Sequence, residues 1–189
     1  MFNIMMDPLP QAWKGKKIDT SFRIGMQVSQ CLSDEELTIQ ERISCALELI
    51  FADDGDIPQD YAEKTECVQW YLNGWCMDNL PKKSNSHVKI MDFDVDQGRI
   101  YAAFLTRYRI ELDAVDMHFW KFMMLLNNLE ECTYTRVIAL RNQKIDPKLS
   151  AETKKALREA KNMYSLQNKE DEQSEQDAEA IALFNQLRK

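Results

Sequence analysis

Cysteine and histidine are the residue types in this chain that could do chemistry, but their spacing favours neither a metal site nor a redox pair. The number of cysteines is odd, and no C-x-x-C sequence occurs. We therefore expect free thiols buried on apolar helical faces, with a disulfide pair or a metal site as the alternative. The cysteines are Cys31, Cys45, Cys67, Cys76 and Cys132.

The two histidines lack the companions that a metal site needs. His87 stands in a polar loop with no second histidine or acidic cluster at ligand spacing, so a solvated side chain is expected. His118 is followed by Phe119 and Trp120, which favours a hydrogen-bonded or partly exposed helical histidine.

The acidic sequence DDGD at 53–56 could suggest a calcium-binding EF-hand loop, but the residues at the ligand positions of such a loop are unsuitable. With Gly55 in the glycine place, the first ligand would be Ile50 and the twelfth Tyr61. We predict an acidic turn instead, followed by a helix with Pro58 in its first turn. The chain also has no Gly-rich phosphate loop, H-E-x-x-H or G-x-S-x-G sequence, so we expect no enzyme and no cofactor.

Composition indicates an all-α protein that avoids nucleic acid and membranes. The chain has 189 residues with only 5 Gly and 5 Pro, and the β-branched runs of a sheet are missing. A net charge of −7 disfavours nucleic acid and anionic membranes as partners. No apolar run approaches the roughly 20 residues of a membrane span, and the N-terminus lacks the pattern of a secretory signal. A cytoplasmic location is expected.

The most apolar segment lies within residues 92–141, where the periodicity predicts three successive helices. Asp92 is a good N-cap for the first, which runs to about Arg107. Asp113 or Asp116 can cap the second, which must be covered nearly all round and is therefore the expected hub of the core. The third lies near 134–140.

Capping signals place the other helices. Thr20 or Ser21 can cap a helix to about 32, and Thr38 with Glu41 forms a capping box for a helix to about 51. Ser150 caps another helix from 151. We predict a compact domain of six to seven helices at 20–166, after an irregular arm at 1–19 with a short extended segment or a hairpin near 13–18. A polar linker at 167–177 and a short amphipathic helix at 178–189 follow.

Two apolar features could bind a partner. A stripe behind the linker could dock on another molecule, dock on the body or fray. Three residues at the central helix, which could also be ordinary core, complete the candidate set. The candidates are Ile181, Leu183, Phe184, Leu187, Met117, Trp120 and Met124.

A basic helical face offers a different interpretation. Lys154, Lys155, Arg158 and Lys161 could contact nucleic acid as part of an RNA- or DNA-binding regulator. Because the flanking segments are acidic, we favour a solvated face.

Several blocks, in order, resemble the small siphophage protein family labelled by open-reading-frame number fifteen. The resemblance covers about residues 7–166. The blocks include IDTSFR at Ile18–Arg23, ALELIF at Ala46–Phe51, DIPQDY at Asp56–Tyr61, FDVDQGRIYAAFLTRYRIEL at Phe93–Leu112, HFWKFMMLLNNL at His118–Leu129, IALRNQKID at Ile138–Asp146 and MYSL at Met163–Leu166. The chain departs from the family pattern at Arg109–Glu111 and at Phe119, and both departures look like packing variations.

The resemblance implies a non-enzymatic protein of the phage tail operon, encoded between the major tail protein and the tape measure protein. It implies a tail assembly chaperone that binds the tape measure and tail tube proteins in the host bacterial cytoplasm. A structural tail or connector component retained in the virion is the alternative. A homo-oligomer is left open.

Overall fold

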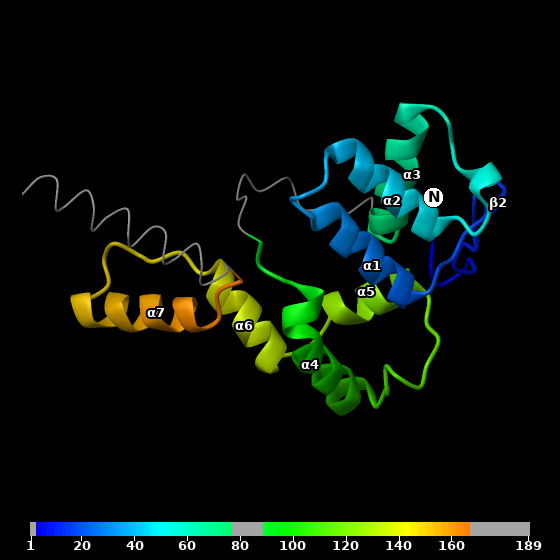
Figure 1. Cartoon of the computed structure of the whole chain (residues 1–189). Helices are drawn as coiled ribbons and strands as arrows, with labels where there is room; N and C mark the ends of the chain where they lie inside the picture. The colour runs from blue at the N-terminus through cyan, green and yellow to red at the C-terminus, as the bar shows by residue number, and fades with distance from the viewer. Residues whose placement is uncertain (1–2, 77–88, 167–189) are drawn as a thin grey trace, which may run out of the picture. The chain divides into compact units, whose positions relative to one another are not determined.

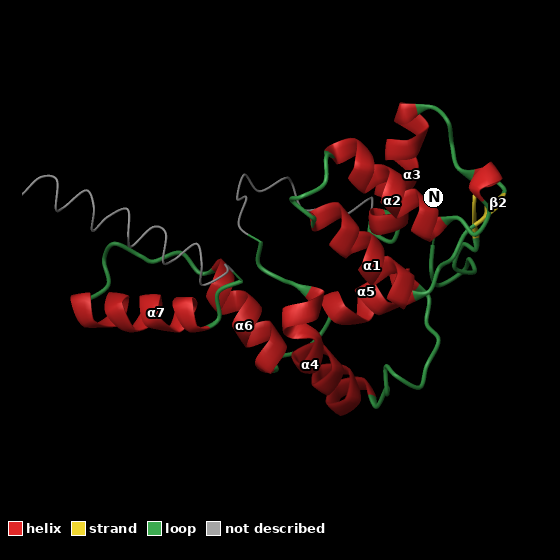
Figure 2. Ribbon diagram, viewed as in Figure 1, coloured by secondary structure: helices red, strands yellow, loops and turns green. Residues whose placement is uncertain are grey.

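A computed structural model describes residues 3–76 and 89–166, and the regular secondary structure in this part of the chain is almost all helical (Figures 1 and 2). It contains seven α-helices and a single two-stranded hairpin, which confirms the predicted all-α class. The elements are β1 (Ala12–Trp13), β2 (Lys16–Lys17), α1 (Phe22–Ser33), α2 (Ile39–Ile50), α3 (Tyr61–Asn73), α4 (Phe93–Ala103), α5 (Phe119–Asn127), α6 (Thr133–Asn142) and α7 (Ala151–Met163).

The chain forms two compact units. The first comprises residues 1–86 and 97–132, and the second comprises 87–96 and 133–189. The boundary falls inside α4, so its first turn belongs to the second unit and the rest to the first. The boundaries predicted at 19, 166 and 177 stay a prediction, and the linker at 167–177 and the tail at 178–189 lie outside the described residues.

Several helices begin at the capping residues that the sequence indicated. The Ser21 hydroxyl accepts from Arg23 N at 3.3 Å. Thr38 and Glu41 form the reciprocal capping box, with Glu41 N donating to Thr38 Oγ1 at 3.3 Å and Thr38 N to Glu41 Oε2 at 2.8 Å. Asp92 and Ser150 cap α4 and α7 in the same way, so these predictions are confirmed.

Two predicted helix starts were wrong. Pro58 does not lie in the first turn of α3, because Asp60 caps the helix by accepting from Ala62 N at 2.9 Å. Neither predicted aspartate caps α5. His118 caps it instead, with Nδ1 accepting from Trp120 N at 3.0 Å.

The aromatic side chains of α5 make it the hub of the first unit, as predicted. Phe122 stacks between Phe22 and Phe104, with ring centroids 5.1 Å away on each side. On the next face Phe119 stacks on Tyr71 at 5.6 Å, and the Trp120 indole N–H donates to the Tyr71 carbonyl at 2.7 Å. The core is therefore held by ring contacts from α1, α3 and the π-helical turn Phe104–Tyr108 that follows α4.

The N-terminal hairpin forms at the predicted place. Lys14 and Gly15 make its turn with φ of 46° and 83°, a region in which glycine is unstrained. Trp13 and Ile18 are buried, so the hairpin is packed on the core.

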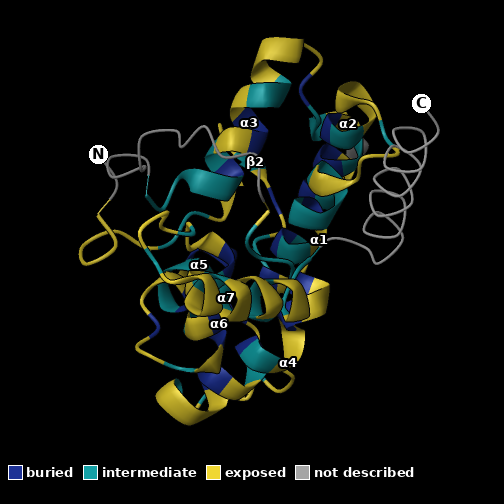
Figure 3. Ribbon diagram, turned by 90° about the vertical axis from the view of Figure 1, so that its left-hand side faces the viewer, coloured by how far each residue is buried: buried dark blue, intermediate teal, exposed yellow. Residues whose placement is uncertain are grey.

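The second unit is organised around a buried ion pair. Arg141 on α6 donates from Nη1 to Asp96 Oδ2 at 2.6 Å and from Nη2 to Oδ1 at 3.1 Å. The same guanidinium reaches the carbonyls of Ile90 and Tyr164, at 3.1 and 2.6 Å. It thereby joins the start of α4, α6 and the end of α7. By contrast α7 has no buried residue, which Figure 3 shows as a ribbon without dark blue.

Candidate functional site

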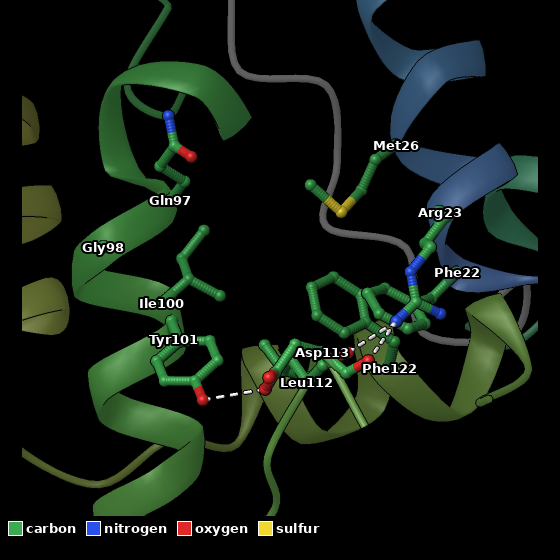
Figure 4. A pocket seen from close by; sticks show the side chains of 10 residues that line it. All are labelled: Phe22, Arg23, Met26, Gln97, Gly98, Ile100, Tyr101, Leu112, Asp113 and Phe122. Carbon is green, nitrogen blue, oxygen red and sulfur yellow. Dashed lines mark hydrogen bonds between the residues drawn. The ribbon is translucent and has the colours of Figure 1, made fainter. Parts of the chain in front are cut away.

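A pocket of about 430 Å³ in the first unit is the candidate functional site (Figure 4). Its walls come from α1, α4, α5 and the loop between α4 and α5. It is lined by Phe22, Arg23, Met26, Gln97, Gly98, Ile100, Tyr101, Leu112, Asp113 and Phe122. Its volume lies in the range of about 300–1,000 Å³ that is typical of ligand sites.

The apolar part of the pocket is built on the aromatic stack of the core. Phe22 and Phe122, which stack on each other, are both buried, as are Ile100 and Leu112. Close-packed rings on regular helices are held in place by their neighbours. This surface is therefore formed before any partner arrives.

The α4 wall contains a glycine at a point where space is open. A Cβ built on Gly98 meets no atom within 4 Å. Gly25 on α1 contrasts with it, because a Cβ there would lie 2.1 Å from the Phe119 ring. Gly25 is thus required by helix packing, whereas a side chain at Gly98, which lines the pocket, would meet open space.

Arg23 fixes the loop that closes one end of the pocket. Its guanidinium donates to three main-chain carbonyls, at 2.8 Å (Leu112), 3.3 Å (Asp113) and 3.1 Å (Val115). The charge also lies over the Phe22 ring, 4.6 Å from its centroid. Arg23 therefore serves chiefly to hold the loop.

The loop that Arg23 holds also carries acidic side chains at the edge of the pocket. The Tyr101 hydroxyl donates to Asp113 Oδ1 at 2.8 Å, and this hydrogen bond raises the pKa of Tyr101, with the nearby charge of Glu111 acting in the same direction. Asp113 and Glu111 are both exposed. The site thus combines an apolar floor with a carboxylate edge, an arrangement suited to binding.

The three sequence-predicted partner residues that the structure describes do not line this pocket. Met117 and Trp120 are buried, with exposures of 7% and 3%, so in this conformation they belong to the core. Met124 is half-buried on α5. The other four predictions, Ile181, Leu183, Phe184 and Leu187, lie outside the described residues.

The cysteines are all free, as expected, but only Cys67 is buried and the other four are half-buried. Burial raises the pKa of the Cys67 thiol to about 12, which keeps it protonated and unreactive at neutral pH. Within residues 3–76 and 89–166, no cluster of three or more His, Cys, Asp or Glu side chains could hold a metal ion. No helix in the same ranges is long and apolar enough to span a membrane.

Two of the four residues of the predicted basic face are engaged by the protein itself. Lys161 Nζ donates to the carbonyls of Arg141 and Gln143 at 2.9 and 2.6 Å. Lys154 Nζ donates to the Pro147 carbonyl at 2.7 Å. Only Lys155 and Arg158 of this set are exposed on α7, so the face is a weaker site for phosphates than the sequence suggested.

Sequence reasoning missed the pocket, although helical periodicity places five of its ten lining residues on apolar faces. Phe22 and Met26 belong to one such face and Ile100 to another, but periodicity carries no information on which faces meet. Which residues line the pocket depends on how the helices lie in the folded first unit.

Comparison with known proteins gives one match. The model of the family described as Bacteriophage Gp15 protein matches residues 5–166. No curated protein and no solved structure matches the chain.

Proposed function

We propose that this chain, which belongs to the Bacteriophage Gp15 protein family, is a non-enzymatic tail assembly chaperone. The family makes it a phage structural or assembly-related protein. In the proposed role it binds the tape measure protein in the host bacterial cytoplasm, keeps its apolar helices soluble and assists assembly of the tail tube protein around it.

The pocket beside α4 is the observation that carries this proposal. A chaperone for apolar helices needs a preformed apolar surface and no catalytic group. The pocket is preformed in this sense, because its floor of Phe22, Ile100 and Phe122 is buried and already fixed by packing within the first unit, while the half-buried Met26 lies at its side. A net charge of −7 favours solubility of the chain and of a complex with an apolar client.

A second apolar surface supports the same role. Residues 3–7 form a turn in which Met6 N and Asp7 N donate to the Asn3 carbonyl, at 2.9 and 2.7 Å. This turn leaves Met5 and Met6 88% and 83% exposed. Methionine adapts to partners of varied shape, so these side chains suit a surface that binds more than one sequence.

Co-expression with the tape measure protein tests the proposal. The tape measure protein alone is expected in the insoluble fraction. With this chain present it should become soluble and co-purify on a tag carried by the chain. If the tape measure protein stays insoluble, or is equally soluble with an unrelated acidic helical protein, the chaperone role is rejected.

A further inference from the structure

We infer that the pocket beside α4 takes a bulky apolar side chain, of Phe or Leu size, from a partner segment that carries Lys or Arg next to that residue. This inference rests on the proposed function, because the partner it describes is a client protein. It adds the chemistry of the segment that is bound.

The apolar half of this specificity follows from the lining. Buried rings of Phe22 and Phe122 form the floor, and the side chains of Met26 and Ile100 flank it (Figure 4). An apolar side chain that enters gains contacts with fixed rings and leaves water, which is the main favourable term in such binding. A polar side chain would lose hydrogen bonds with water that the floor cannot replace.

The charge of the neighbouring residue follows from the edge of the pocket. Asp113 and Glu111 place two carboxylates near the Tyr101 hydroxyl. Arg23 is the cation among the lining residues and keeps its charge while it donates to three loop carbonyls, so two carboxylates stand against one cation at this edge. A Lys or Arg beside the bound side chain therefore meets an acidic edge, whereas Asp or Glu there would be repelled.

Gly98 allows the pocket to be closed without disturbing the fold. It is exposed, and a new Cβ would meet nothing within 4 Å, so Gly98→Leu adds bulk at the pocket wall in open space. Leucine also favours a helix interior more than glycine does. Gly98→Ala is the matched control, because alanine also has a higher helix propensity than glycine but adds little volume.

The test is an NMR titration of the full chain, labelled at the methyl groups of Met26 and Ile100. The probes are the peptides acetyl-Ala-Lys-Phe-Lys-Ala-amide, its Glu-Phe-Glu counterpart and its Lys-Ala-Lys counterpart. We expect saturable shifts with the first peptide, about tenfold weaker binding with each of the others, and about tenfold weaker binding of the first to Gly98→Leu. Gly98→Ala, which adds a single carbon at the same position, should bind the first peptide more tightly than Gly98→Leu does.

Removal of the acidic charge tests the second half separately. Asp113→Asn keeps an acceptor for the Tyr101 hydroxyl but loses the charge. It should reduce the preference for the Lys-Phe-Lys peptide over the Glu-Phe-Glu peptide. The inference is overturned if Gly98→Leu binds the first peptide as well as Gly98→Ala does, or if the acidic peptide binds equally well to the unsubstituted chain.

The inference and the proposed function fail in different ways. If Gly98→Leu solubilises the tape measure protein as fully as the unsubstituted chain, the pocket is not the binding site and the chaperone role stands. If the peptides bind as expected but the tape measure protein stays insoluble, the specificity of the pocket stands and the client has been wrongly assigned.

Discussion

Replacing Arg141 by methionine should destabilise the second unit more than replacing both members of its ion pair. Asp96 is fully buried and Arg141 is 7% exposed. Loss of the guanidinium leaves a buried carboxylate without its cation, which typically costs about 3–5 kcal/mol. The carbonyls of Ile90 and Tyr164 also lose a donor.

In the double variant Asp96→Leu, Arg141→Met neither charge of the buried pair remains. Replacing a buried pair by apolar residues of similar volume is often neutral or better. The carbonyls of Ile90 and Tyr164 still lose the Arg141 donor, and each loss lowers the free energy of unfolding by about 1–3 kcal/mol where the carbonyl stays buried and by less where water reaches it. We therefore expect the double variant to be more stable than Arg141→Met by roughly 2 kcal/mol.

Equilibrium unfolding in guanidinium chloride, followed by circular dichroism, measures this order. Hydrogen exchange at the amides of α6 assigns the effect to the second unit. The reasoning is refuted if the double variant is as unstable as the sum of the two single variants, since the two side chains would then act independently.

Two further predictions concern the first unit. Gly25→Ala should lower the thermal unfolding midpoint, since its Cβ would lie 2.1 Å from the buried Phe119 ring. Gly98→Ala should raise the midpoint, because no atom obstructs that position and alanine favours a helix more than glycine does. Thermal unfolding of both variants checks the two signs, and equal shifts would contradict the packing described. The free energy of unfolding should also fall as the pH drops below about 6.5, the ordinary His pKa. Burial lowers the pKa of His118, and the hydrogen bond to the Pro10 carbonyl, which acts in the opposite direction, offsets this only in part. The contribution of neutral His118 to the free energy of unfolding is fully present above that pH, and it is lost as the pH falls through the lowered pKa. His118→Asn, which keeps a capping side chain, should flatten the pH profile of the unfolding midpoint between pH 7 and pH 5, and an unchanged profile would exclude His118 as the cause.

The structure explains why some elements were predictable and others were not. The Thr38–Glu41 capping box lies within four residues, so the sequence alone specifies it. The start of α5 is set by long-range contacts. Phe119 N donates to the Thr20 carbonyl at 2.7 Å, and Phe22 N to that of Met117 at 2.8 Å. These bonds tie the two helix starts together, so His118 caps α5 although two aspartates lie just before it.

The same distinction applies to the sites. The Asp96–Arg141 pair joins residues 45 positions apart, and the pocket lining extends from Phe22 to Phe122. Helical periodicity placed Met117 and Trp120 beside an apolar surface, and burial put both in the core. Periodicity predicts that a face is apolar. Whether that face is covered depends on the packing of helices that are distant in the sequence.

The central claim is that this protein binds the tape measure protein during assembly and then leaves. Quantitative mass spectrometry of one infection tests it most directly, by comparing tape measure complexes isolated from the lysate with purified virions. The account predicts that this chain is abundant on the complexes and absent from the virions. A fixed number of copies in the virions, with none on the tape measure complexes, would contradict it and identify a structural tail or connector component.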